Sequence, residues 1–209
     1  NWKSAHPELV VLGDNESTKK DQLSLSWSEI TGRSSEIVPE KARVSDMVVL
    51  SRLSAVGDDL SIAMCESTLM EGGCPVLFAV QEIPQTIGKN ITLFWNGSLE
   101  CARAVHMAFP FLYKADKITV LTTSKVDTMG ESGPALKKYL SYHGLDVDLL
   151  DLDCENSRIG EAILKNSSDL KADLFIMGAY SHSRLREWVL GSITRHVLRE
   201  ATIPCLLIH

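Results

Sequence analysis

The residues best suited to chemistry lie in one glycine- and serine-containing loop near the C-terminus. Gly178 ends an apolar run, a polar stretch follows, and Gly191 and Ser192 open a segment of helical pattern. Glycine lets a ligand approach the backbone closely, and the free N–H groups at a helix start present the positive end of the helix dipole. The spacing predicts an anion site. A bound phosphate would rest on the N–H groups of Gly191, Ser192 and Ile193, and Thr194 would add a second hydroxyl donor beside that of Ser192.

The same residues also have a plainer interpretation. Gly178 could be a strand-end turn, and Gly191 and Ser192 could serve only as a helix cap. The sequence contains no Gly-x-Ser-x-Gly segment, and no carboxylate pair or third histidine accompanies His182 and His196 to hold a metal ion. We therefore predict no metal site and no catalytic residues, because no general base can be named.

The five cysteines argue against zinc or disulfide chemistry. Their number is odd, they are widely spaced, and no C-x-x-C pair occurs. Cysteines in apolar or helical contexts behave as small buried hydrophobic residues, and reduced thiols predict a cytoplasmic location. The cysteines are Cys65, Cys74, Cys101, Cys154 and Cys205.

Composition limits the partners of this chain. The 21 Lys and Arg residues are outnumbered by 27 Asp and Glu residues, which gives a formal net charge of −6. A protein that binds duplex nucleic acid needs a surplus of cations, so we expect no nucleic-acid partner. Apolar runs such as Val76–Val80 are far shorter than the roughly 20 residues that span a bilayer, so we expect no membrane partner.

The elements that position the loop form an internal repeat. Asp46, followed by an apolar run, matches Asp173 at a shift of 127 positions, and Pro75 matches Pro204 at a shift of 129. Small loop insertions in one copy of a duplicated domain produce such an increase of the shift along the chain. Repeats of this kind reveal the architecture before any single element does.

Within each copy, short apolar runs alternate with amphipathic stretches of helical length. The runs predict buried strands at Leu23–Ile30, Met47–Leu50, Pro75–Val80, Ile91–Trp95, Ile118–Thr122, Val147–Leu152, Leu174–Met177 and Cys205–Ile208. The stretches predict helices at Ser34–Ala42, Asp58–Met70, Ser98–Leu112, Gly133–His143, Ser157–Leu170 and Gly191–Ala201. Asn156 and Ser157 are expected to begin one helix, and Gly144 to end another. The alternation predicts an α/β fold with an open, mostly parallel five-stranded sheet and helices on both faces.

The two copies differ in length. Residues 88–209 contain five strand patterns and predict a complete domain, whereas residues 1–84 lack the first strand, helix and second strand of the repeat. Leu9–Leu12 reads as a strand that the repeat does not place. We expect the tail of one domain followed by a whole second domain.

At this point the sequence resembles the universal stress protein family. The family's nucleotide loop, Gly-x2-Gly-x9-Gly-Ser/Thr, is matched by the loop from Gly178 to Ser192 with Ser181 at its second position. Leu93–Ser98 resembles the family's first strand and Asp-Gly-Ser turn, and Val197–Ile208 its closing helix and strand. The resemblance covers residues 88–209, and 21–84 more weakly, so the chain looks like a tandem member.

The resemblance implies an adenine nucleotide alpha hydrolase-like fold that binds ATP or another adenine nucleotide, with Mg²⁺. The ribose is then expected near Asn96 and Gly178, and the base near Thr122. Two departures weaken this site: Ser181 replaces a glycine, and Asn96 replaces an aspartate whose charge would face the ligand. The first copy has Ser51 in place of Gly178 and is not expected to bind ATP.

Two classes of function remain. The chain is either a stress-response sensor that binds ATP, with at most slow hydrolysis, or a ligand-free dimerisation and interaction module with degenerate loops. We expect the strands Pro75–Val80 and Pro204–Ile208 to lie side by side in a pseudo-two-fold pair. Because the sheet of the incomplete first domain has an edge with unpaired backbone groups, we also expect a homodimer.

Overall fold

The computed structural model describes residues 10–12, 22–51, 59–80, 84–123, 130–155, 158–180 and 192–209. Backbone contacts divide the chain into two compact units, residues 1–33 and residues 34–209. In the first unit, β1 (Val10–Val11) pairs in parallel with β2 (Ser24–Leu25). The predicted strand Leu23–Ile30 is therefore wrong in its length, because β1 provides backbone partners for only two of its residues.

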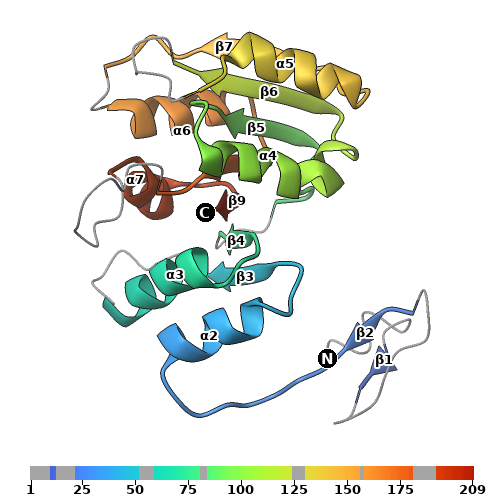
Figure 1. The fold of residues 1–209 in the computed structure, drawn as a ribbon, viewed down its shortest axis with the longest axis vertical. Coiled ribbons are helices and arrows are strands. Elements are labelled where there is room, and N and C mark those ends of the chain that lie inside the picture. The colour runs from blue at the N-terminus through green and yellow to red at the C-terminus, as the bar shows by residue number, and fades with distance from the viewer. Residues whose placement is uncertain are drawn as a thin grey trace. The chain divides into compact units, whose positions relative to one another are not determined.

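The second unit is built on one seven-stranded sheet (Figure 1). Every neighbouring pair is parallel except the pair formed by β4 and β9, so the predicted mostly parallel α/β fold is confirmed. The predicted five-stranded sheet of residues 88–209 is the part that runs from β9 to β7. In spatial order the strands are β3 (Val48–Ser51), β4 (Val76–Ala79), β9 (Cys205–Ile208), β8 (Leu174–Gly178), β5 (Asn90–Phe94), β6 (Lys117–Thr122) and β7 (Asp148–Asp151).

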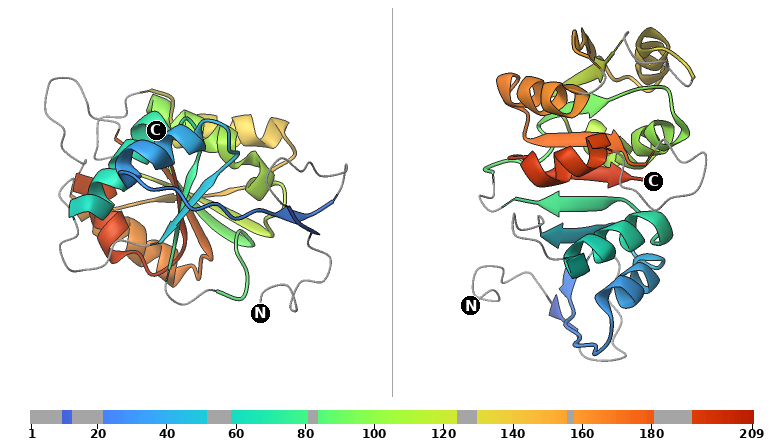
Figure 2. Two further views of the ribbon diagram at one scale, coloured as in Figure 1. Left: turned by 90° about the horizontal axis from the view of Figure 1, so that it is seen from below. Right: turned by 90° about the vertical axis from the view of Figure 1, so that its left-hand side faces the viewer.

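Helices cover both faces of this sheet (Figure 2). Residues of α3, α6 and α7 form one buried cluster with β4, β8 and β9, and residues of α4 and α5 form a second cluster on the other face. The helices of the described chain are α2 (Ser34–Ala42), α3 (Asp59–Glu71), α4 (Leu99–Leu112), α5 (Gly133–Tyr142), α6 (Ile159–Asp169) and α7 (Ser192–Glu200). They match the six predicted helices to within two residues at each end, the usual uncertainty of helix boundaries.

Local signals explain where several helices begin and end. The Ser98 hydroxyl accepts the N–H of Cys101 at 3.2 Å and caps α4. Gly144 follows α5 with φ of +74°, and Leu145 N–H donates to the Leu140 carbonyl, so the predicted end at Gly144 is confirmed. Helix α6 begins after Arg158, and the predicted cap at residues 156–157 lies outside the described residues.

The internal repeat is visible in the strand register. Val48 faces Val76 between β3 and β4, just as Phe175 faces Cys205 between β8 and β9, at the shifts read from the sequence. Strands β4 and β9 pair antiparallel with Leu77 opposite Leu206 at the centre, and the register is symmetric about that pair. The predicted adjacency of the two closing strands is confirmed, and the symmetric register is what a pseudo-two-fold axis at this pair produces.

The continuous sheet joins the two copies. Residues 34–209 form one compact unit because β4 and β9 hydrogen-bond across the copies, and the predicted domain boundary at residues 84–88 stays a prediction. Strand β3 is the last strand at one end of the sheet among the described residues. This unpaired sheet edge is the feature from which the sequence predicts a homodimer. The oligomeric state stays a prediction.

Candidate functional site

The candidate site lies at the carboxyl ends of three neighbouring parallel strands. In the order β8-β5-β6, Gly178 ends β8, Thr122 ends β6, and Asn96 follows β5 by two residues. The chain leaves β5 toward β6 on one side and leaves β8 toward β9 on the other. The carboxyl edge between β5 and β8 is therefore the topological switch point, where open α/β sheets bind their ligands. The structure thus brings Asn96, Thr122 and Gly178 to one edge of the sheet.

Asn96 builds the turn that starts α4. Its side-chain carbonyl oxygen accepts the N–H of Ser98 at 3.0 Å, an Asx turn that an aspartate would also form. Gly97 has φ of +77°, and a Cβ on it would lie 2.9 Å from the backbone nitrogen of Gly130. Asn96 is buried, and it forms this turn without the charge that an aspartate would bring.

The loop after β6 is fixed against the same turn. The indole Nε1–H of Trp95 donates to the carbonyl oxygen of Glu131 at 2.8 Å, and Gly130 packs backbone to backbone on Gly97. The side chain of Trp95 is buried in the core. The turn after β5 and the segment that leads into α5 therefore hold each other in place.

Two other parts of the chain contact Thr122. Its carbonyl oxygen accepts the N–H of Leu152 at 2.7 Å, and its methyl group occupies the place that a Cβ on Gly133 would take. The residue is half-buried. Its predicted contact with a nucleobase stays a prediction.

Gly178 serves a purpose that the sequence did not reveal. A Cβ at this position would lie 2.5 Å from the Cys101 nitrogen and 2.5 Å from the Glu100 carbonyl carbon. The glycine therefore makes room for the first turn of α4 against the end of β8. Its absent side chain is explained by helix–strand packing, whether or not a ligand also contacts its backbone.

Tyr180 was missed by the sequence analysis. It follows Gly178 by two residues, has φ of +66°, and contacts the His209 ring edge-on at a centroid distance of 5.9 Å. Burial, and next the nearby Glu66 carboxylate, raises the pKa of its hydroxyl, which has no hydrogen-bond partner among the described residues. Tyr180 directly precedes the candidate loop, and its left-handed backbone conformation is strained in the way often found at functional sites. No sequence pattern predicts this conformation.

The first turn of α7 contains Ser192 and Ile193, two of the residues predicted to bind phosphate. Helix α7 begins at Ser192, and Ile193 is half-buried against the core cluster. Thr194 is 3% exposed, and its predicted role as a hydroxyl donor to a phosphate stays a prediction. The predicted positions Ser181 and Gly191 lie outside the described residues.

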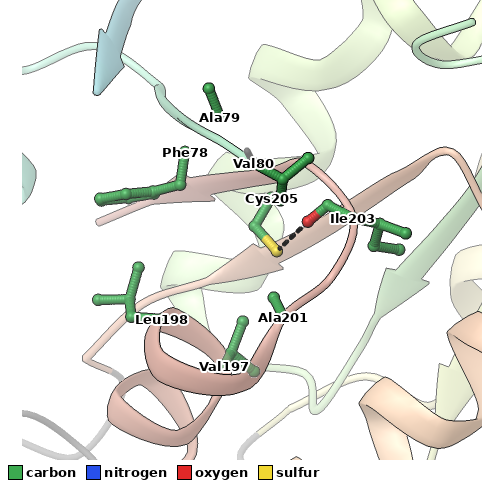
Figure 3. A pocket seen from close by; sticks show the side chains of 8 residues that line it. All are labelled: Phe78, Ala79, Val80, Val197, Leu198, Ala201, Ile203 and Cys205. Atoms are coloured by element: carbon green, nitrogen blue, oxygen red, sulfur yellow. Dashed lines mark hydrogen bonds between the residues drawn. The ribbon is translucent and has the colours of Figure 1, made fainter. Parts of the chain in front are cut away.

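An apolar hollow among the described residues lies away from this edge (Figure 3). The Cys205 thiol in it donates to the carbonyl oxygen of Ile203 at 3.3 Å. The described residues contain no group of three His, Cys, Asp or Glu side chains that could hold a metal ion. The lining residues are Phe78, Ala79, Val80, Val197, Leu198, Ala201, Ile203 and Cys205.

Comparisons with known proteins identify the family. A model of the universal stress protein family matches residues 89–209. The chain belongs to the universal stress protein family. Universal stress protein Slr1230 of Synechocystis sp. is 34% identical over 129 residues, which are 58% of this chain and 42% of that protein. The chain therefore spans less than half the length of this relative.

Solved structures of universal stress proteins share the fold of nearly the whole chain. A universal stress protein from Archaeoglobus fulgidus superposes with a TM-score of 0.67 at 15% identity, covering 91% of this chain and 67% of its own. A putative universal stress protein from Pseudomonas aeruginosa gives 0.60 at 14% identity, covering 96% and 81%. Both halves of the chain are thus parts of this fold. None of the described helices is long and apolar enough to cross a membrane.

Proposed function

We propose that this universal stress protein acts in stress response by binding an adenine nucleotide such as ATP at the carboxyl edge of β8, β5 and β6. The observation that supports this most is the topological switch point between β5 and β8, where α4 and α7 both begin. Two helix N-termini at one edge favour an anion there, because their unpaired N–H groups and dipoles attract negative charge. The family resemblance supplies the ligand class.

In this proposal the nucleotide lies across the switch point. The N–H groups in the first turn of α7, from Ser192 and Ile193 together with Gly191, hold the phosphates, and Mg²⁺ accompanies them. The ribose lies beside Asn96, which is already fixed by its bond to Ser98. The base lies toward Thr122, on the adjoining strand β6.

Titration calorimetry with ATP tests the proposal on the parent chain and on Ser181→Gly. If Ser181 narrows the loop, restoring glycine relieves one strained residue, and we expect roughly tenfold tighter binding, about 1.4 kcal/mol. Ser51→Gly is the matched control, because Ser51 occupies the position of Gly178 in the first repeat. The Ser51→Gly variant should bind ATP with the same affinity as the parent chain. If neither the parent nor Ser181→Gly binds ATP at millimolar concentration, the proposal fails.

The second candidate is a ligand-free interaction module. Two observations favour it: the backbone of α4 fills the space beside Gly178, and the hollow next to Val197 and Cys205 is apolar. Mass spectrometry of small molecules released from freshly purified protein separates the candidates. A stoichiometric adenine nucleotide supports the sensor, and its absence supports the interaction module.

We also infer a reducing, cytoplasmic compartment. None of the five cysteines forms a disulfide, and three of them are buried. Burial, and next the neighbouring Glu66 carboxylate, raises the pKa of the Cys65 thiol to about 12, so it stays protonated and unreactive. Cell fractionation with antibody detection tests the location.

A further inference from the structure

The closing helix and strand of the first repeat, α3 and β4, are equivalent to α7 and β9 of the second. Helices α3 and α7 end, and strands β4 and β9 begin and end, at residue numbers that differ by 129 each time. Leu77 lies opposite Leu206 in the antiparallel strand pair, and these two leucines are equivalent at the same shift. The backbone pairing is thus symmetric, and in this register two first repeats or two second repeats would pair equally well.

The side chains that flank the central pair are not symmetric in size. Val76 lies opposite Leu207, and Phe78 lies opposite Cys205. All four side chains are buried in one cluster, because residues two apart on a strand share a face. Side chains that lie directly opposite each other on antiparallel strands are in contact range. The largest of the four therefore packs across from the smallest, and both line the apolar hollow (Figure 3).

Pairing of two like repeats would lose this fit. Residues 76 and 205 are equivalent, and so are residues 78 and 207. Two first repeats would therefore place a valine opposite a phenylalanine on both sides of the central leucines. Two second repeats would place a cysteine opposite a leucine on both sides. The first arrangement overfills a closed core and the second leaves it underfilled, and both changes are destabilising.

The helices above these strands carry opposite charges at equivalent positions. Glu66 on α3 and Arg195 on α7 are related by the same shift of 129 positions, and Glu66 is half-buried while Arg195 is exposed. Burial raises the pKa of the Glu66 carboxyl, and the charge of Arg195 acts against this rise, so the two side chains interact electrostatically. Two like repeats would bring two carboxylates or two guanidinium groups together here, and like charges repel.

We propose that α3 and β4 of the first repeat form a recognition surface that is specific for α7 and β9 of the second repeat. The Phe78–Cys205 and Glu66–Arg195 pairs determine this specificity, because each becomes a mismatch when two like repeats meet. The first repeat is therefore the dedicated partner of the second, and a second copy of either repeat does not replace it. This role is independent of any ligand at the carboxyl edge of the sheet.

Variants of the full chain can build each like pairing within one molecule. Cys205→Val with Leu207→Phe gives both strands the side chains of the first repeat, and Val76→Cys with Phe78→Leu gives both strands those of the second. All four substitutions together exchange the two sides and restore an unlike pair. Equilibrium urea unfolding of the four proteins measures the coupling between the two sides of the pair.

Each like-paired variant should lower the equilibrium constant for folding at least tenfold. The variant with all four substitutions should be at least tenfold more stable than the two separate losses predict. If the losses simply add, or if a like-paired variant is as stable as the parent, the proposal is overturned. A four-substitution variant that fails to fold counts against it equally, because the exchanged pair then gives no rescue.

A second series of variants tests the charged pair. Arg195→Glu should lower the equilibrium constant for folding about threefold at low salt, and Glu66→Arg added to it should restore the parent value. Lys138→Glu on exposed α5, on the other face of the sheet, is the control that Glu66→Arg should not rescue. The difference between Arg195→Glu and the parent should disappear in 1 M NaCl, because salt screens the repulsion. No rescue, or a difference that persists in high salt, overturns the role of Glu66 and Arg195.

Discussion

The two repeats of this universal stress protein share one strand register but differ in what surrounds it. Val49 on β3 and Ile176 on β8 occupy equivalent positions, each opposite a leucine of the neighbouring closing strand. Ile176 is enclosed by β5 and by the helices of one face, while Val49 is largely exposed. The register of each strand is therefore set by the strand's own sequence pattern, whereas the burial of its side chains depends on the strand and helices beside it. A β-branched apolar side chain at this register position therefore contributes differently to stability in the two repeats.

The largest effect should come from truncating the enclosed member of this pair. Ile176→Ala removes three carbon atoms from a fully buried site, and such changes cost about 3 kcal/mol in transfer and cavity energy. Val49→Ala should cost less than about 0.5 kcal/mol, because its side chain is already solvated. Equilibrium urea unfolding of both variants measures the difference, and equal losses would show that the β3 face is covered in solution.

A smaller effect is expected where the two strands end. Gly178→Ala puts a Cβ against the backbone of Glu100 and Cys101, and the resulting displacement of α4 should cost about 2 kcal/mol. Ser51→Ala, at the equivalent exposed position, should be neutral. Because α4 carries the Asn96 turn on its N-terminal side, Gly178→Ala should also weaken any ATP binding. Unfolding and calorimetry on the same two variants check both statements, and a stable Gly178→Ala protein would refute the packing role assigned to this glycine.

The sequence predicted the parts of the molecule that follow from periodic patterns. The repeat shift predicted that β4 and β9 would be neighbours, and the alternation of apolar runs with helical stretches predicted the parallel sheet. The family resemblance placed Asn96, Thr122 and Gly178 around one ligand, and the structure brings them to one edge because parallel strands end on the same side. The predicted strand Leu23–Ile30 failed in length because a strand needs a partner that its own pattern does not specify.

The contacts that fix the candidate site were not predictable in the same way. Gly178 looked like a ligand-contacting glycine, and only the approach of α4 reveals its packing role. Tyr180 adopts a left-handed conformation that tyrosine rarely adopts, so its residue type gave no signal. The carboxylate of Asp173 accepts four hydrogen bonds from a segment more than 80 residues away in the chain. Aspartate before a strand is common, and sequence alone does not show which amides it meets.

The smallest effect concerns the two aspartates and depends on pH. Burial alone would raise the pKa of Asp173, but hydrogen bonds from Thr86, from residues 88 and 89 and from Asn90 outweigh it and hold the pKa below its usual value. The ionised form is therefore the one that the folded state favours. Asp173→Asn should cost about 1 kcal/mol at neutral pH, a value kept low because the carboxylate is half-exposed to solvent. Asp46→Asn should cost nothing measurable.

The sign of the pH dependence follows from this lowered pKa. The stabilisation by Asp173 is fully present above the unfolded-state pKa of about 3.9 and is lost as the pH falls through the lower folded-state value. The difference in unfolding free energy between the parent and Asp173→Asn should be constant from pH 7 to about pH 5 and should shrink below about pH 4. Urea unfolding at intervals between pH 7 and pH 3 measures it, with Asp46→Asn as the matched control in the first repeat. If the difference in unfolding free energy between the parent and Asp173→Asn stays constant down to pH 3, the stabilisation by Asp173 does not depend on its charge. A pH-dependent loss in Asp46→Asn as well would show that Asp46 already has a partner in solution, and the contrast between the two repeats would fail at this position.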